Sequence, residues 1–235
     1  MNEQKTPTIM SFLGLEELSE AVTKMTVAKI LQGIGMRGIF HLALTGGEVG
    51  SVVTRKLVLR WNAHPEQYAG LHLWWGDERF LRTGDEERNA MVLLESLHQD
   101  SPIHVHQVLS SDSGVPLSVA VKRYAADITG INMDLTLLGV GADGHVASIF
   151  PGHFAGGANE DIFAVSDAPK NPPLRVSFSM AKINASDSVW LMAVGASKRG
   201  AVGQILAHDL SIPATFVHGQ LETLLFVDSQ STVID

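Results

Sequence analysis

The feature that most restricts the fold is an alternation in which a short, mainly apolar run meets glycine and is followed by a segment with helical spacing of apolar residues. The apolar runs are Ile39–Leu44, Leu71–Trp75, Met133–Val140 and Val189–Val194. The helical segments are Leu15–Gly33, Val49–Trp61, Pro116–Ile128 and Ser197–Ala207. Short apolar runs predict strands buried on both faces. Strands that alternate with helices predict an α/β fold, with a mostly parallel sheet covered by helices on both faces.

The remaining segments complete this pattern less regularly. We expect a helix at Glu86–Leu97 and strands at Leu174–Met180, Ala214–Val217 and Leu224–Val227. Glycine and proline are frequent in Gly144–Asn159 and Ala168–Pro173, so these two segments are predicted to be loops. The chain has 235 residues and no long linker, so one α/β domain is expected over residues 1–235.

The formal net charge of −8 narrows the range of partners. An acidic chain repels nucleic acid and anionic membranes, so neither is expected to bind, and an anionic ligand would need a local basic cluster. The absence of cysteine excludes disulfides, thiolate nucleophiles and zinc–thiolate sites. Met1–Met10 lacks the pattern of a signal peptide, and no run reaches the ~20 apolar residues of a membrane helix. We therefore expect a cytoplasmic protein.

Several predicted strands end in residues suited to binding or catalysis. These residues are Thr45-Gly46-Gly47, Asp77-Glu78-Arg79, the loop from Gly141 to His145, and Lys198, while Arg175 lies in the strand from Leu174. Ligands bind at the carboxyl ends of the strands in an open parallel sheet, so these residues are expected to meet at one edge.

His145 is the candidate general base. It follows a loop with three glycines, close to Asp143 and just past a predicted buried strand. A neutral imidazole can deprotonate water near pH 7, and Asp143 either orients the ring or caps the following turn. His104 and His106 share one strand face without an evident third ligand, so we expect them to be structural.

The loop Thr45-Gly46-Gly47 joins a strand to a helix. Glycines at such a junction let backbone N–H groups approach a phosphate, and the helix N-terminus favours an anion. The alternative is a simple tight turn. Glu48 argues against a phosphate site, because a carboxylate there would compete for the same positive helix end.

The basic residues of the candidate site have structural alternatives as well. Arg79 suits an oxyanion or a phosphate, but with Asp77 and Glu78 it could form only a local ion pair. Lys198 lies near the start of a helix, where a bound anion would compensate its charge. Alone it would be an ordinary solvated lysine. Arg175 is the other candidate for the basic cluster.

The glycines Gly139-x-Gly141-x-x-Gly144 match a dinucleotide-binding fingerprint, with Asp167 further along the chain. That fingerprint requires a helix directly after the third glycine. The segment from Pro151 onward is rich in glycine instead, which disfavours a dinucleotide site.

Taken together, several stretches resemble those of one family. They are LALTGG (Leu42–Gly47), WWGDERF (Trp74–Phe80), Asn89, DLTLLGVGADGHVASIFPG (Asp134–Gly152), PKNPPLRVSFS (Pro169–Ser179) and VGASKRGAV (Val194–Val202). The chain resembles the 6-phosphogluconolactonases, relatives of the glucosamine-6-phosphate isomerases, over most of its length. The stretch around DGH is the most specific of these.

The resemblance implies a Rossmann-like α/β sandwich that hydrolyses 6-phosphogluconolactone, a phosphorylated sugar lactone, in the oxidative pentose phosphate pathway. No cofactor is predicted, and no metal, because a lactone is already an activated ester. By the resemblance, His145 is the base and Arg79 is the arginine of the DER motif. The phosphate contacts map onto Gly46, Gly47, Arg175 and Lys198.

The first loop departs from the family pattern. The family commonly reads SGGSTP where this chain reads TGGEVG. Glu48 and Val49 therefore replace two hydroxyl side chains, while Thr45 keeps one. We expect Arg175 and Lys198 to carry more of the phosphate binding.

The predicted mechanism is attack of water, activated by His145, on the lactone carbonyl. The oxyanion would be met by backbone N–H groups of the glycine loop, which includes Gly141 and Gly144, or by Arg79. One alternative is an aminosugar-phosphate isomerase, which the lack of a carboxylate in Val146–Phe154 disfavours. The other is a non-catalytic sugar-phosphate sensor, which would not need these catalytic side chains together.

Overall fold

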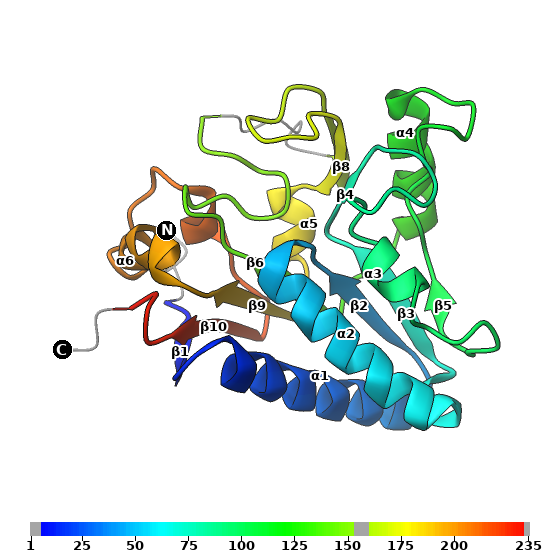
Figure 1. Ribbon diagram of the computed structural model, residues 1–235, viewed down its shortest axis with the longest axis horizontal. Helices are drawn as coiled ribbons and strands as arrows, with labels where there is room; N and C mark the ends of the chain where they lie inside the picture. The colour runs from blue at the N-terminus through cyan, green and yellow to red at the C-terminus, as the bar shows by residue number, and fades with distance from the viewer. Residues whose placement is uncertain (1–5, 153–159, 233–235) are drawn as a thin grey trace.

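A seven-stranded sheet forms the centre of the computed structural model, which describes residues 6–152 and 160–232. In spatial order its strands are β1 (Thr8–Phe12), β10 (Glu222–Asp228), β9 (Ser188–Ala193), β6 (Leu135–Gly139), β2 (Phe40–Leu44), β3 (Leu71–Trp75) and β5 (His104–Val105). All adjacent strands are parallel, which confirms the predicted parallel sheet (Figure 1). Part of the predicted loop Gly144–Asn159, residues 153–159, lies outside the described residues.

Helices cover both faces of this sheet, as the sequence predicts. One face is covered by α1 (Leu15–Arg37), α2 (Gly47–Ala63) and the short α3 (Met91–Leu94). The other is covered by α4 (Leu117–Ile128), α5 (Met180–Asn184) and α6 (Arg199–Leu206). Figure 1 shows α1 and α2 side by side. Along β2, Leu42 and Leu44 belong to the first core and Ala43 to the second, because successive side chains of a strand point to opposite faces.

None of the helices in the described ranges combines the length and the apolar composition needed to cross a membrane.

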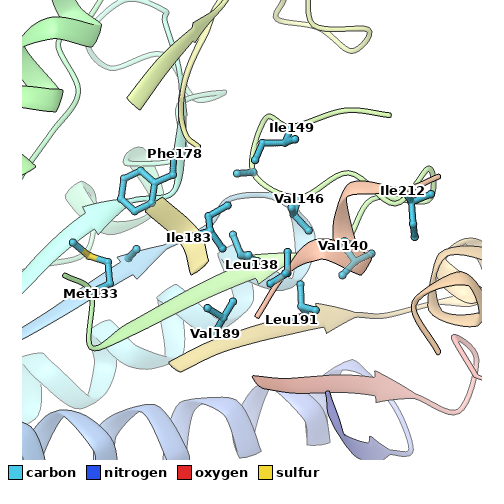
Figure 2. Packing of buried hydrophobic residues seen from close by; sticks show 14 of the residues in the cluster. Met133, Leu138, Val140, Val146, Ile149, Phe178, Ile183, Val189, Leu191 and Ile212 are labelled. Atoms are coloured by element: carbon cyan, nitrogen blue, oxygen red, sulfur yellow. The ribbon is translucent and has the colours of Figure 1, made fainter. Parts of the chain in front are cut away.

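The core beneath α4 to α6 also anchors the loop that follows β6. Val146 and Ile149 of this loop are buried near Leu138 of β6 (Figure 2). The backbone of Val146 forms bridges with Val140 and Ile149. Burial of an aliphatic side chain stabilises a fold by roughly 1.5–3 kcal/mol. Apolar residues therefore fix the loop that carries His145.

A second, three-stranded sheet begins where β3 ends. Its strands are β4 (Asp77–Arg79), β8 (Arg175–Phe178) and β7 (Ile162–Val165), in that order, and both pairings are antiparallel. The strand predicted at Leu174–Met180 corresponds to β8, but the sequence did not predict a separate sheet. Strands of three or four residues leave too short a pattern to assign a partner. This sheet sets Arg79 directly opposite Arg175.

The helix predicted at Glu86–Leu97 is wrong, because only the turn α3 is α-helical there. Arg88 and Asn89 are buried and bonded to other segments. Arg88 Nη2 donates to the Val108 carbonyl at 2.7 Å, and Asn89 Nδ2 donates to the Asp77 carbonyl at 2.8 Å. These tertiary bonds hold the chain in turns where periodicity alone predicts a helix.

The strand predicted at Ala214–Val217 is also wrong, because Pro213–Phe216 forms a 3₁₀ helix, η3. Proline suits its first turn, and the Ala214 N–H donates to the Gly144 carbonyl at 3.0 Å instead of to a strand. The edge strand β1 was not predicted. The first helix continues past its predicted end at Gly33.

Candidate active site

A pocket lies at the carboxyl ends of β2, β3, β6 and β9, where the loops that follow these strands meet. Of the residues singled out in the sequence, its lining includes Thr45, Gly46, Gly47, Asp77, Arg79, Asn89, Gly141, His145, Arg175 and Lys198. Asp143 is not part of the lining but contacts the His145 ring. Gly144 is also outside it and lies against Ile212.

His145 and Asp143 form a closely coupled pair. The His145 Nδ1 and Asp143 Oδ1 atoms are 2.5 Å apart, and the Phe150 ring lies 4.8 Å from the His145 ring, centroid to centroid. Burial opposes ionisation of Asp143, but the hydrogen bond and charge of His145, with the charge of Lys170, lower the pKa of Asp143 to about 2. An ionised Asp143 accepts the Nδ1 proton, so the ring presents its unprotonated Nε2 as the basic atom.

Gly141 provides the room for this pair. A Cβ at this position would lie 1.9 Å from His145 Nδ1 and 2.4 Å from Asp143 Oδ1, closer than any side-chain carbon approaches. Only glycine lets the ring and the carboxylate approach the strand end in this way.

The amides of the two predicted glycine ligands are used within the loop itself. The Gly141 N–H donates to the His145 carbonyl at 2.8 Å, and the Gly144 N–H donates to the Gly141 carbonyl at 3.0 Å. These bonds shape the turn. The Gly141 and Gly144 amides are therefore already engaged, and Arg79 stays the other candidate donor to an oxyanion that the sequence suggested.

Arg79 lies in β4 with its guanidinium in the pocket lining. Its Nη1 donates to the Glu87 carbonyl at 2.5 Å. Its Nε is buried and has no hydrogen-bond partner among the described residues. A buried, unpaired N–H costs free energy unless a ligand accepts it, so this atom is suited to an oxygen of a bound molecule.

Glu78 is structural. It is fully buried, and its carboxylate accepts the backbone N–H groups of Arg79 at 2.7 Å, Asn89 at 2.7 Å and Ala90 at 3.0 Å. Burial raises its pKa, against the effect of these hydrogen bonds. Glu78 thereby holds the segment of Asn89 against β4.

Asp77 joins several parts of the pocket. Ser148 Oγ donates to its Oδ2 at 2.7 Å, and Asn89 Nδ2 lies 3.3 Å from its Oδ1. Arg175 Nη1 is 3.8 Å from the same Oδ2. A buried carboxylate is tolerated only with such partners. The contacts link Asp77, a candidate for a catalytic or an orienting role, to Ser148, Asn89 and Arg175.

The loop Thr45-Gly46-Gly47 leads into α2, whose N-terminus has no side-chain cap. A Cβ at Gly46 would lie 1.8 Å from Asn89 Oδ1, so the Asn89 amide covers the bare backbone here. The uncapped N–H groups of the first helical turn face the pocket end of β2, where they can bind an anion. Glu48 and Val49 also line the pocket.

Arg175 and Lys198 supply positive charge in different ways. Arg175 is 4% exposed, and three of its donors are engaged by the carbonyls of Lys170, Asn171 and Pro172 at 3.0 to 3.2 Å. The side-chain ammonium of Lys198 has no hydrogen bond or ion pair within the described part of the chain, while its backbone N–H donates to the Gly195 carbonyl at 3.0 Å. Burial, and then the charge of Lys170, lower its pKa.

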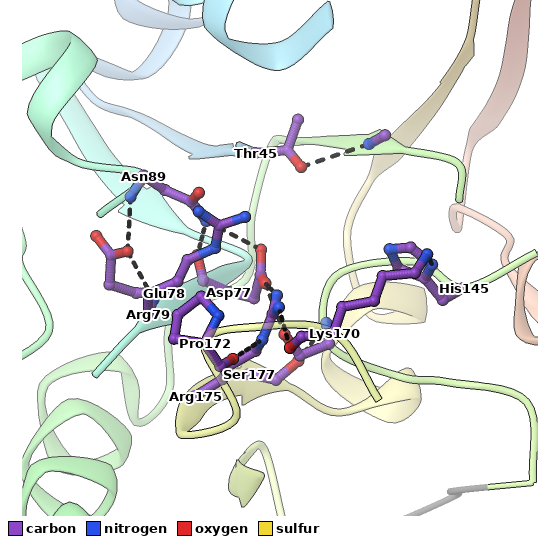
Figure 3. A network of polar contacts seen from close by, with 12 residues as sticks. Thr45, Asp77, Glu78, Arg79, Asn89, His145, Lys170, Pro172, Arg175 and Ser177 are labelled. Carbon is purple, nitrogen blue, oxygen red and sulfur yellow. Dashed lines mark hydrogen bonds and ion pairs between the residues drawn. The ribbon is translucent and has the colours of Figure 1, made fainter. Parts of the chain in front are cut away.

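Lys170 is the site residue that the sequence analysis missed. Its Nζ lies 3.2 Å from Asp143 Oδ1 and 3.2 Å from His145 Nδ1 (Figure 3). It belongs to the predicted loop Ala168–Pro173, which has no periodicity to mark it. The only sequence signal was its place in the stretch PKNPP.

His104 and His106 belong to a stack of histidines that also includes His72 and His41, which lie near the amino ends of β3 and β2. His72 stacks on His104 at 4.3 Å between centroids, and His72 Nδ1 lies 2.9 Å from His106 Nε2. His106 stacks on Trp74 at 3.8 Å. Across residues 6–152 and 160–232, no group of three or more His, Asp or Glu side chains is arranged to hold a metal ion.

Comparisons with known proteins match this geometry. The profile of the glucosamine-6-phosphate isomerases/6-phosphogluconolactonase family matches residues 14–226. A 6-phosphogluconolactonase of Streptomyces coelicolor is 35% identical, over 95% of this chain and 93% of its own. One of Rattus norvegicus is 32% identical, over 89% and 86%. The crystal structure of 6-phosphogluconolactonase from Thermotoga maritima superposes with a TM-score of 0.81 at 26% identity, over 94% of this chain and 99% of its own. The chain belongs to the glucosamine-6-phosphate isomerase/6-phosphogluconolactonase family.

Proposed function

We propose that this protein hydrolyses 6-phospho-D-glucono-1,5-lactone to 6-phospho-D-gluconate, the lactonase step of the oxidative pentose phosphate pathway. The observation that carries the proposal is the Asp143–His145 pair at the pocket wall, with the basic Nε2 of His145 unpaired among the described residues. The relatives named 6-phosphogluconolactonase, which align over most of their length, support the substrate.

The chemistry follows from the tautomer of His145. Its Nε2 removes a proton from water as the water oxygen bonds to the lactone carbonyl carbon. The resulting oxyanion accepts the Nε N–H of Arg79. When the bond to the ring oxygen breaks, His145 returns the proton to that oxygen, which leaves as a hydroxyl group. Asp143 stabilises the imidazolium between the two proton transfers.

The 6-phosphate binds at the other side of the pocket. The amides at the start of α2, with Gly46 and Gly47, and the ammonium of Lys198 form its site. Arg175 adds charge, but its donors mostly hold the loop of Lys170. Lys198 is therefore the principal side-chain ligand of the phosphate.

The aminosugar-phosphate isomerase and the sugar-phosphate sensor are not favoured. An isomerase needs a further acid for ring opening, and the carboxylate nearest to His145 is Asp143, which is occupied by the ring and by Lys170. A sensor has no need of an oriented base.

The test is release of 6-phosphogluconate from freshly generated lactone, followed with 6-phosphogluconate dehydrogenase after subtraction of spontaneous hydrolysis. We expect clear acceleration, and a loss of about 10²–10⁴-fold in His145→Ala. The matched control is His98→Ala, an exposed histidine, which should keep full activity. Full activity in His145→Ala would remove His145 from the mechanism, and no acceleration by the natural chain would contradict the function.

A further inference from the structure

The contact between Lys170 and His145 is not an ordinary hydrogen bond. A lysine ammonium has only donors, and His145 Nδ1 already carries the proton that it donates to Asp143. Two donors, Lys170 Nζ at 3.2 Å and His145 Nδ1 at 2.5 Å, therefore meet at one acceptor, Asp143 Oδ1. The ammonium is also 3.2 Å from the ring itself. A cation is thus held against a base that must become a cation during the reaction.

A buried arginine holds the backbone of the loop that carries Lys170. Arg175 Nη2 donates to the carbonyl of Lys170 at 3.0 Å and of Asn171 at 3.2 Å, and its Nε donates to that of Pro172 at 3.0 Å. The Ala168 N–H donates to the Pro173 carbonyl and closes the loop. A nearly inaccessible guanidinium committed to three loop carbonyls fixes the backbone from which the Lys170 side chain reaches His145 (Figure 3).

Lys170 acts on the substrate only through other residues, since it does not line the pocket. Its charge disfavours the imidazolium form of His145. It also shares the Asp143 oxygen that would otherwise stabilise that form alone. Both effects favour a neutral ring, whereas Asp143 by itself would favour a protonated one.

The other charged groups around His145 do not replace the effect of Lys170 on the protonation of the ring. Those that line the pocket with it are Glu48, Asp77, Arg79, Arg175 and Lys198. Burial lowers the pKa of His145, the hydrogen bond and charge of Asp143 raise it, Lys170 lowers it, and Asp77 raises it. Within residues 6–152 and 160–232, Lys170 is the cation that contacts the ring.

We propose that Lys170 is a positioning residue of the general base: it keeps the His145 imidazole neutral, with Nε2 free for water, and holds Asp143 on the Nδ1 side. The proposal rests on the proposed lactonase function for its kinetic consequence, but not for its effect on the ring.

The kinetic test compares Lys170→Met with Lys170→Arg over pH 5.5 to 8. Without the ammonium, His145 binds its proton at higher pH, so kcat/KM of Lys170→Met should fall about fivefold to tenfold at pH 6. At pH 8 it should equal that of the natural chain within about twofold. Lys170→Arg retains the charge and should keep the natural profile. Lys122→Met, which removes an exposed lysine of α4, is the matched control. An equal loss at every pH, or no loss, would overturn the proposal.

The second test needs no substrate and separates the proposal from the function. Ring resonances of the 10 histidines are titrated by NMR in the natural chain and in Lys170→Met, and His145→Asn identifies the His145 signal. We expect the pKa of His145 to rise by about 1 in Lys170→Met and to stay in place in Lys170→Arg. An unchanged His145 titration would overturn the role of Lys170 even if the chain is a lactonase. A raised one would support it even if the lactone is not the substrate.

Discussion

Ser148 Oγ donates a hydrogen bond to Asp77 Oδ2 at 2.7 Å, and both side chains are buried. The bond ties the loop after β6 to the start of β4, two segments that both contribute residues to the lining of the pocket. In Ser148→Ala the carboxylate loses its shortest hydrogen bond. We expect the free energy of unfolding to fall by about 1.5–3 kcal/mol, the usual cost of a hydrogen bond to a charged group.

Urea denaturation at pH 7 measures this change. Ser118→Ala, at an exposed position on α4, should alter the free energy of unfolding by no more than about 0.5 kcal/mol. Equal stability of the two variants would show that Asp77 does not depend on Ser148.

Gly141→Ala should remove activity more than stability. The added methyl group overlaps His145 Nδ1 and Asp143 Oδ1, so the pair must move, and the base loses its orientation. We expect kcat/KM to fall by about 100-fold or more, measured with the coupled lactonase assay. Gly200→Ala in α6, where a Cβ meets nothing within 4 Å, should keep activity and gain up to about 1 kcal/mol of stability. Normal kinetics in Gly141→Ala would mean that the loop adapts.

Arg175→Lys should shift the pH profile in the same way as Lys170→Met. A lysine cannot donate to the three loop carbonyls at once, so Lys170 is no longer held at His145. We expect kcat/KM at pH 6 to fall at least fivefold, and the double variant Arg175→Lys/Lys170→Met to move the acid limb of the profile no further. Arg60→Lys, half-exposed on α2, is the control. Additive shifts of the acid limb would show that the two residues act separately.

The histidine stack should make the protein less stable in mild acid. Burial, and then the charges of His72, His106, Arg37 and Lys182, lower the pKa of His41 to about 4. A folded-state pKa below the unfolded value of about 6.5 means that the unfolded chain binds more protons between these values. The contribution to stability is therefore present above pH 6.5 and is lost as the pH falls toward 4.

Thermal unfolding at pH 7 and pH 5 measures this effect. We expect a loss on the order of 1–2 kcal/mol from His41 at pH 5. His41→Asn keeps an acceptor for the Trp74 Nε1 donor, which lies 3.1 Å from His41 Nδ1, but does not titrate. It should therefore reduce the difference between the two pH values. An identical difference in His41→Asn would assign the acid sensitivity to other groups.

The parallel sheet could be predicted from sequence because its strands are buried on both faces. Runs such as Leu135–Gly139 have no solvent-exposed face, so nearly all their residues are apolar. The glycines at their ends mark where the strands stop. Segments whose conformation depends on tertiary bonds could not be predicted. Arg88 and Asn89 lie in a stretch with helical spacing, but their side chains are bonded to β4 and to the chain near Val108.

The candidate site, too, could be predicted from the sequence only in part. His145, Asp143 and the glycines share one loop, so their association is visible in the sequence. Lys170 reaches them from another loop, which leads into β8 and so lies near β4, the partner of β8. The roles of these residues remain predictions for the experiments above.

The pairing of β1 with β10 has a consequence for synthesis of the chain. Beside this pair, Ser229 Oγ donates to the Leu13 carbonyl across 216 residues. The ribosome adds roughly 5–20 residues per second, so β10 is made roughly 10 to 40 s after β1. β9 is complete only about 30 residues before β10 begins, so the edge of β9 that β10 later covers stays unpaired for roughly 1.5 to 6 s. The central sheet can therefore be completed only after β10 has been synthesised and has paired with both β9 and β1.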